Sequence, residues 1–206
     1  MTLNDFVDKI YCVNLDRRPD RWARCQEIFK QHDLRVERAP AVDGKTLSGG
    51  KLPLGALGVL RSVLGLLEGA KRDNLQSICI FEDDIELGDD FNKKFSDFAE
   101  ELPSNWFFFY LGASNKKPSI QISPHINKLK KAYGAYAVII HGCMYERLIE
   151  ELSEENLQVD LVYAKLQSKY PAYITTPYLA WVRNDYSDIN ERFINVSHLR
   201  QDKYAE

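Results

Sequence analysis

The stretch Ser-Ile-Cys-Ile-Phe-Glu-Asp-Asp at residues 77–84 decides the predicted fold. It begins with a short apolar run, residues 77–81, and passes directly into Glu82, Asp83 and Asp84. Short, continuous apolar runs are typical of strands in a parallel sheet that is covered on both faces. Ligands bind such sheets beyond the carboxyl ends of the strands. We therefore expect the three carboxylates at a ligand-binding edge.

On either side of this stretch, segments with the apolar pattern of a strand alternate along the chain with segments that have the apolar spacing of a helix. Further strands are predicted at residues 9–15, 35–39, 106–111, 136–140 and 172–176. Helices are predicted at residues 19–32, 55–72, 91–101, 143–152 and 159–169. This alternation predicts an α/β fold with a mostly parallel sheet and helices on both faces. The polar segment 113–131 is predicted to be a long loop, of the kind that often forms a lid, and the tail from Asn184 to be irregular.

The composition is that of a globular protein without a strong charge excess. The chain has 206 residues, of which 45% are hydrophobic, and a formal net charge of −3. This length favours a single domain over residues 1–206. The net charge argues against a general electrostatic grip on nucleic acid, which needs a basic excess. The apolar runs are too short to predict a transmembrane segment.

The pattern of cysteines and the N-terminal residues indicate in which cellular compartment the protein works. No C-x-x-C pair occurs, so a zinc knuckle is not expected, and the apolar surroundings of the cysteines predict buried, reduced thiols. Residues 1–15 lack the basic and apolar regions of a signal peptide. A cytoplasmic location is therefore expected. The cysteines are Cys12, Cys25, Cys79 and Cys143.

The acidic triplet has the chemistry of a divalent-metal site. Closely spaced carboxylates repel one another, and a bound cation relieves that repulsion. Magnesium and manganese prefer oxygen ligands and commonly use one or two carboxylates together with phosphate oxygens. The alternative is that these acids cap a helix or face water. That alternative is favoured for the acids that follow, Glu86, Asp89 and Asp90.

A second polar segment, Asn-Leu-Asp-Arg-Arg-Pro-Asp-Arg at residues 14–21, lies at the carboxyl end of the first predicted strand. Helix N-termini attract phosphate, and arginines add bidentate, charge-assisted donors. The segment is neither a P-loop nor a G-x-G-x-x-G fingerprint. Two interpretations stay open from these residues alone: a phosphate-binding turn and a solvated, charged helix start.

Five ordered blocks resemble glycosyltransferase family 25, the group of lipooligosaccharide and collagen galactosyltransferases. Residues 13–21 resemble the family's INLxRRxDR start, residues 38–44 its R..AVDG block, and residues 80–85 its LEDDV metal motif. Residues 132–137 resemble the GTxGYxI segment, and residues 159–160 a later VD. Each block is weak alone, but together and in order they are fairly specific.

The resemblance implies a GT-A type fold and a metal-dependent, inverting transferase with a UDP-sugar as donor and Mn²⁺ or Mg²⁺ as cofactor. It implies that Asp84 binds the metal, that Glu82 touches the metal or the ribose, and that Asp83 orients the site. A further ligand is expected from the tail, from Asp188 in a segment similar to the family's SDI and otherwise from His198. The residues expected near the nucleotide or its sugar are Asn14, Arg17, Asp43, Tyr133 and Tyr136.

An inverting displacement also needs a general base that takes the proton of the acceptor hydroxyl. Asp160 is the candidate, because it opens a predicted helix within the fifth block. The alternative is that Asp160 is an ordinary helix N-cap. The resemblance implies that the acceptor hydroxyl belongs to a glycan or a glycoprotein.

One block departs from the family pattern. The family's GEIGCxxSH corresponds to residues 55–63, where Ala56, Val59 and Val63 replace the glutamate, the cysteine and the histidine. This departure leaves open a non-catalytic relative that binds a sugar nucleotide or a glycan. A metal-dependent phosphate-ester hydrolase is a further alternative, since it too uses clustered carboxylates. It would not explain the first and fourth blocks.

Overall fold

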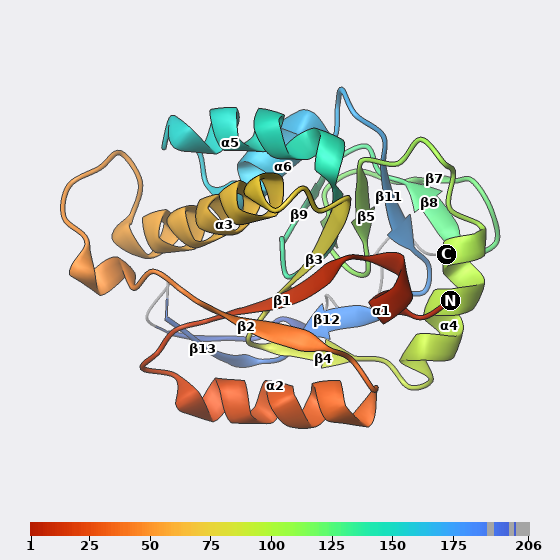
Figure 1. The fold of residues 1–206 in the computed structure, drawn as a ribbon, viewed down its shortest axis with the longest axis horizontal. Helices are drawn as coiled ribbons and strands as arrows, with labels where there is room; N and C mark the ends of the chain where they lie inside the picture. Colours follow the sequence, from red (N-terminus) through yellow and green to blue (C-terminus); the bar gives the residue numbers. More distant parts are fainter. Residues whose placement is uncertain (189–191, 198–199, 201–206) are drawn as a thin grey trace.

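A mixed sheet forms the centre of the molecule, of which the computed structural model describes residues 1–188, 192–197 and 200 (Figure 1). Its strands are β1 (Lys9–Asn14), β2 (Val36–Pro40), β3 (Ser77–Glu82), β5 (Phe108–Tyr110), β7 (Ile120–Gln121), β8 (Ile126–Lys128), β10 (Ala137–His141) and β11 (Ala172–Thr175). Their order is β2-β1-β3-β10-β5-β11-β8-β7. β1, β2 and β3 are parallel, β10 is antiparallel to both of its neighbours, and β5 and β11 are again parallel.

Helices cover both faces of this sheet, as predicted (Figure 1). α1 (Leu3–Phe6), α2 (Pro19–Gln31) and α4 (Phe91–Glu100) pack on one face. α3 (Leu54–Arg72), α5 (Tyr145–Ser153) and α6 (Val159–Leu166) pack on the other. The predicted α/β architecture with a mostly parallel sheet is therefore confirmed.

The alternation of side chains along β3 determines where the acidic triplet points. Cys79 and Phe81 belong to the apolar layer under α2 and α4, while Ile78 and Ile80 belong to the layer under α3, α5 and α6. Burying each large apolar side chain stabilises the fold by about 1.5–3 kcal/mol, so the register of β3 is strongly specified. Continuing the alternation directs residue 82 towards α3 and residue 83 towards α2.

Two predicted loop regions contain strands instead. The segment 113–131 holds β6 (Ser114–Asn115), β7 and β8, and β8 extends the main sheet beside β11. β6 pairs with β9 (Ala132–Tyr133), and β4 (Ile85–Leu87) pairs with β12 (Ala180–Val182). The tail forms a hairpin of β13 (Asp185–Ser187) and β14 (Arg192–Ile194). These strands of two or three residues are too short to leave a periodic signal in the sequence.

The cysteines are free, and three of them are buried as predicted. Cys143 is exposed, so its prediction as a buried thiol was wrong. It lies in a 3₁₀ turn, Gly142–Met144, between β10 and α5, where the chain leaves the core. Within the described residues, the structure contains no helix long and apolar enough to cross a membrane.

Candidate functional site

A cleft of three adjoining cavities lies at the carboxyl ends of β1 and β3. The first, of about 210 Å³, is lined by Arg17 and Asp43, and the second, of about 160 Å³, by the whole acidic triplet. The third, of about 150 Å³, is lined by Asp160. Val59 lines all three, Asp188 lines the first two, and Glu82 lines the last two. The cleft therefore brings together residues from seven separate parts of the chain.

Close backbone packing against α3 shapes the first cavity. A Cβ atom on Gly58 would lie 2.5 Å from the carbonyl oxygen of Val42, and one on Gly44 would lie 2.3 Å from that of Leu54. Contacts this short are not tolerated by backbone atoms, so both positions require glycine. The segment that carries Asp43 can therefore lie directly on the helix, with Asp43 at the cavity wall.

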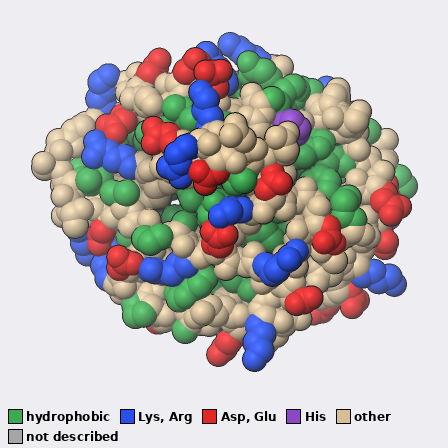
Figure 2. Space-filling view, in the orientation of Figure 1, with side chains coloured by type: hydrophobic (Ala, Val, Ile, Leu, Met, Phe, Trp, Pro, Cys, Tyr) green, Lys and Arg blue, Asp and Glu red, His purple; other side chains and the backbone are tan. Residues whose placement is uncertain are grey.

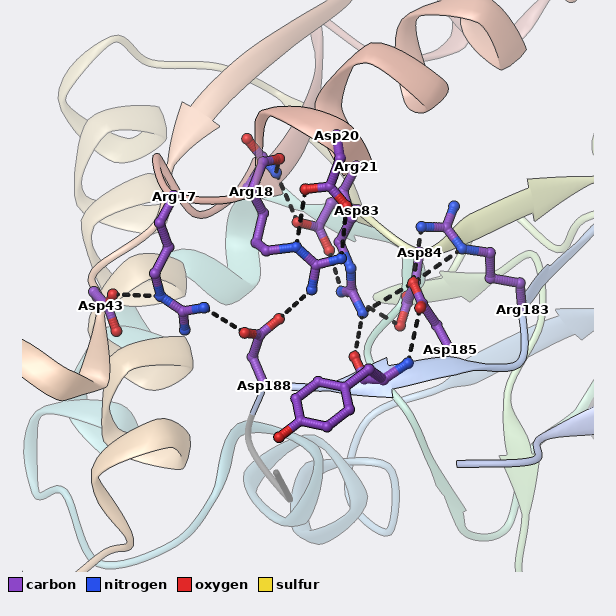
Figure 3. Close-up of polar contacts among 12 residues, drawn as sticks. Arg17, Arg18, Asp20, Arg21, Asp43, Asp83, Asp84, Arg183, Asp185 and Asp188 are labelled. Atoms are coloured by element: carbon purple, nitrogen blue, oxygen red, sulfur yellow. Dashed lines mark hydrogen bonds and ion pairs between the residues drawn. The ribbon is translucent and has the colours of Figure 1, made fainter. Parts of the chain in front are cut away.

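Asp83, which also lines the second cavity, ties three parts of the chain together through its carboxylate and its carbonyl group (Figure 3). Its Oδ2 accepts a hydrogen bond from Asn14 Nδ2 at 2.7 Å, and its Oδ1 accepts one from Arg21 Nη1 at 2.7 Å. Its carbonyl oxygen accepts a bond from the Cys25 thiol at 3.2 Å. Arg21 is itself only 6% exposed, so the pair is buried. Asn14, predicted near the nucleotide, is buried too and supports Asp83.

Glu82 and Asp84 differ from Asp83, because neither is satisfied by the protein. Asp84 Oδ1 is buried without a hydrogen-bond partner among the described residues, and its Oδ2 lies 3.9 Å from Arg21 Nη1. Burial raises the pKa of Asp84 to about 6, although Arg21 opposes the shift. Burial, reinforced by Asp84 and Asp83, raises the pKa of Glu82 to about 8. Two carboxylates with raised pKa values in one cleft are typical of a functional site.

These two carboxylates suit a divalent cation that also binds a phosphate-bearing ligand. Within the described residues, no three His, Cys, Asp or Glu side chains converge closely enough to hold a metal by themselves. Magnesium and manganese sites commonly use only one or two carboxylates and fill the other positions with phosphate oxygens and water. The unpartnered oxygen of Asp84 fits that role, with Glu82 beside it.

Asp188 lies at the cleft but is bonded to two arginines of the first turn (Figure 3). Arg18 Nη1 donates to Asp188 Oδ2 at 2.6 Å, and Arg17 Nη1 donates to the other oxygen. Arg17 Nε also donates to Asp43 Oδ2 at 2.7 Å. Burial opposes it, but the two arginines hold the pKa of Asp188 below its usual value. The assignment of Asp188 to a metal stays a prediction, and His198 lies outside the described residues.

The tail hairpin is joined to α2 by residues that the sequence analysis did not select. Arg21 Nη2 donates to the carbonyl oxygen of Tyr186 at 2.7 Å and lies 3.2 Å from Asp185 Oδ2. Arg183 donates to the same Asp185 oxygen at 2.9 Å. Arg21 had a detectable signal, since it precedes Cys25 and Phe29 by one and two helical repeats on the buried face of α2. Asp185 and Arg183 had none.

Asp160 lies at the far end of the cleft. It is the second residue of α6, and Gln158 is the N-cap, so the alternative that Asp160 is the N-cap is wrong. Its carboxylate has no hydrogen-bond partner in the part of the chain that the structure describes. It lines the third cavity together with Glu82, Gly134 and Ala135. An acceptor hydroxyl in this cavity would therefore meet a carboxylate that is free to accept its proton.

Tyr133 and Tyr136, the two tyrosines expected near the nucleotide or its sugar, line none of the three cavities. Tyr136 is 3% exposed, and its hydroxyl has no hydrogen-bond partner among the described residues. Burial raises the pKa of Tyr136 well above its usual value. The Tyr133 ring lies beneath the Nζ atoms of Lys116 and Lys131, at 5.2 and 5.4 Å from the ring centroid. Stacking of either ring on a nucleotide or sugar stays a prediction.

A comparison with known proteins finds a family model that matches most of the chain. Residues 7–149 match the family model described as glycosyltransferase family 25 (LPS biosynthesis protein). A rat protein named probable inactive glycosyltransferase 25 family member 3 is 25% identical over 169 residues, which cover 71% of this chain and 28% of that protein. Mouse procollagen galactosyltransferase 2 is 24% identical over 165 residues, covering 66% and 26%. The chain thus spans about a quarter of the length of these relatives.

Solved structures show more distant likenesses. A glycosyltransferase involved in glycosylation of the major capsid of PBCV-1 has a TM-score of 0.44 and 11% identity, over 72% of this chain and 67% of that one. A mutant Drosophila galactosyltransferase 7, in complex with manganese, UDP-Gal and xylobiose, has a TM-score of 0.41 and 9% identity, over 95% and 75%.

Proposed function

Because this chain belongs to glycosyltransferase family 25, we propose that it transfers a hexose from a UDP-sugar to a hydroxyl group of a glycan or protein acceptor, with inversion and with a divalent metal. Its sheet and helix layers are those expected of a GT-A type domain. One observation carries the proposal: the cleft has Arg17 in its first cavity, Glu82 and the unpartnered Oδ1 of Asp84 in its second, and Asp160 in its third.

The donor would lie along the first two cavities. Arg17 and Arg18 offer guanidinium groups at a helix start, which suits a diphosphate. Asp84 and Glu82 would hold Mn²⁺ or Mg²⁺, which when bound neutralises the charge that develops on the UDP leaving group. The buried pair of Asp83 with Arg21 would keep Asp84 in position, since it anchors the residue that directly precedes Asp84.

The acceptor would enter the third cavity. Asp160 would accept the proton of the attacking hydroxyl as the new glycosidic bond forms and the bond to UDP breaks. Asp160 lines the third cavity but not the first two, whereas Glu82 lines both the second and the third, so the base would lie next to the donor site without belonging to it. Its freedom from capping and ion pairing suits that role.

A panel of UDP-sugars, screened by thermal shift with MnCl₂ and with EDTA, tests the proposal. A ligand that binds only the folded state raises the melting temperature by mass action. We expect a rise with one UDP-sugar and manganese, no rise in EDTA, and slow release of UDP. Release of inorganic phosphate instead would identify a phosphate-ester hydrolase. No rise with any UDP-sugar would remove the donor assignment.

A second candidate function is that of a non-catalytic relative that binds a sugar nucleotide or a glycan. Ala56, Val59 and Val63, which stand where the family pattern has polar residues, all line the cleft. Relatives named inactive also match this chain. Binding of a UDP-sugar with manganese, but without release of UDP or transfer to any acceptor, would favour this candidate.

We also propose that the protein works in the cytoplasm. The four free cysteines are consistent with a reducing compartment. Cell fractionation of the tagged full-length protein tests this, and recovery in a secreted or membrane fraction would contradict it.

A further inference from the structure

Tyr163 is a residue of the cleft to which the proposed function gives no role. It lies on α6, one helical turn after Asp160, so the two side chains share a face of the helix. Asp160 lines the third cavity and Tyr163 lines the second, while Glu82 lines both. The helix α6 therefore supplies one residue to the proposed acceptor site and one to the proposed donor site.

The Tyr163 hydroxyl is buried and has no hydrogen-bond partner within the described residues. The residue is 1% exposed, and its ring packs against Phe108 with the ring centroids 5.5 Å apart. A phenylalanine would make the same ring contacts. Packing thus accounts for the ring but not for the hydroxyl, because burying a hydroxyl without a partner costs free energy.

Other buried tyrosines of this protein provide a comparison. The Tyr110 hydroxyl accepts a hydrogen bond from Gln167 Nε2 at 2.8 Å, as a structural hydroxyl does. The hydroxyls of Tyr136 and Tyr145 have no partner in the part of the chain that the structure describes, but these two residues line none of the three cavities. Tyr163 combines an unpartnered hydroxyl with a place in the cleft.

The helices α3 and α6 give the second cavity one hydroxyl group among apolar side chains. Val59 and Val63 line this cavity from α3 and can shape it, but they form no hydrogen bonds. Burial, reinforced by Tyr110 and Glu82, raises the pKa of Tyr163 well above its usual value. The hydroxyl therefore keeps its proton at neutral pH and can both donate and accept a hydrogen bond.

Charge cannot distinguish one hexose from another, because hexoses are neutral. On the face drawn in Figure 2, acidic and basic side chains are intermixed and neither sign forms a broad patch. Selection among hexoses needs fixed polar groups inside a cavity, since a site built to bond a hydroxyl disfavours an analogue that lacks it. The Tyr163 hydroxyl has these properties, because the packed ring fixes it and burial shields it from water.

We propose that the Tyr163 hydroxyl binds a hydroxyl group of the donor hexose and thereby helps to select the sugar. The proposal rests on the proposed function, because it takes the second cavity as part of the donor site. The favoured sugar carries a free hydroxyl group where it meets Tyr163, and a sugar that is deoxygenated at that position binds more weakly. Forming this bond removes no water from the tyrosine, so little of its energy is lost to desolvation of the protein.

Calorimetry with MnCl₂ tests the contact. The ligands are UDP, UDP-glucose, UDP-galactose and the singly deoxygenated forms of both UDP-sugars. We expect the wild-type protein to bind one parent UDP-sugar about tenfold tighter than one of its deoxy forms. Tyr163→Phe should bind that parent about tenfold more weakly, but UDP and that deoxy form as the wild type does. Such non-additivity assigns the contact, because each change removes one side of the same hydrogen bond.

Tyr145→Phe is the matched control. Tyr145 packs in the same apolar layer as Tyr163, and its hydroxyl is likewise buried without a partner among the described residues. This variant should bind every ligand as the wild type does.

Thermal unfolding without ligand excludes a structural role for the hydroxyl. Neither Tyr163→Phe nor Tyr145→Phe should melt below the wild type, because neither hydroxyl has a partner to lose. Tyr110→Phe should melt lower, because Gln167 Nε2 loses a partner. A lower melting temperature for Tyr163→Phe would show that the protein itself uses this hydroxyl, and would overturn the proposal.

The binding results separate this proposal from the proposed function. If UDP and every UDP-sugar fail to bind the wild-type protein, both are rejected. If UDP-sugars bind, but no deoxy form binds more weakly than its parent or Tyr163→Phe binds as the wild type does, only the role of Tyr163 is overturned. An equal loss of affinity for UDP and for the UDP-sugar in Tyr163→Phe would place the hydroxyl at the metal or the nucleotide, and would overturn that role too.

Discussion

Asp84 is the residue on which the metal assignment depends most. Its Oδ1 is buried without a partner among the described residues, so the protein alone leaves it unsatisfied. We expect Asp84→Ala to abolish UDP-sugar turnover and the manganese-dependent thermal shift, while the fold persists because a buried, repelled charge is removed. Asp89→Ala, at an exposed acid of the same run, is the control. Full turnover in Asp84→Ala, or in EDTA, would contradict the assignment.

Asp160 is expected to act on the acceptor only. Asp160→Asn keeps the size of the side chain and removes its basicity, and should lower the rate of transfer by about 10²–10⁴-fold. Affinity for UDP, measured by calorimetry, should not change, because Asp160 lies in the third cavity and not beside the arginines. A transfer rate near that of the wild type would exclude Asp160 as the general base. Loss of both transfer and UDP binding would make Asp160 a donor-site residue.

Glu82 should make stability depend on pH. Its folded-state pKa of about 8 exceeds the usual 4.5, so the folded state retains a proton that the unfolded state has lost. Stability therefore falls as pH rises from about 4.5 to about 8. We expect Glu82→Gln to raise the melting temperature in EDTA at pH 8, and the gain to shrink towards pH 5. Thermal unfolding of both proteins between pH 5 and pH 8 measures this gain in melting temperature. An equal gain at pH 5 and pH 8 would contradict the raised pKa of Glu82.

At the scale of elements, Asp188 of the tail competes with a ligand for the two arginines of the first turn. Asp188 engages both Arg17 and Arg18. If these arginines bind the donor diphosphate, Asp188→Asn should strengthen UDP binding, whereas Arg17→Ala should weaken it by on the order of 1.5–3 kcal/mol. A metal-ligand role for Asp188 requires the opposite, a weaker manganese-dependent affinity. Calorimetry with UDP and manganese distinguishes the two, and the ion pairs favour the first.

Long elements could be predicted from the sequence because each contains its own signal. The run at residues 77–81 became β3, and the apolar spacing at residues 55–72 became α3. The strands within residues 113–131 and in the tail could not be predicted. Each has two or three residues, which is too short to show a periodicity. β8 also depends on β11, a partner far along the chain, to complete its hydrogen bonds.

The same distinction holds for the candidate site. The acidic triplet could be found as a cluster, because its members are adjacent in the chain and follow an apolar run. Which carboxylate faces the cleft and which is buried depends on side-chain alternation together with Arg21, a partner 62 positions from Asp83. Pairs between residues so far apart leave no pattern in a single sequence, so the ionic link between the tail and the first turn was missed.

At the scale of the whole molecule, one sheet is shared by two apolar layers. Phe95 and Leu148 are fully buried on opposite faces, yet both layers pack on β3 and β10. We expect Phe95→Ala and Leu148→Ala each to destabilise the fold by about 2–5 kcal/mol in one shared transition. Circular dichroism and tryptophan fluorescence should give coincident urea midpoints in both variants. Separate midpoints would show that the two layers unfold independently.

The contact between Arg17 and Asp188 also has a consequence for biosynthesis. The two residues are 171 positions apart in the chain. At about 5–20 residues per second, a ribosome adds that interval in on the order of 10–30 s. During this time the arginines of the first turn have left the ribosome without the carboxylates of the tail. A nascent chain therefore presents these arginines with Asp20 and Asp43 as partners but without Asp188. Its cleft is completed only after Asp188 has been added.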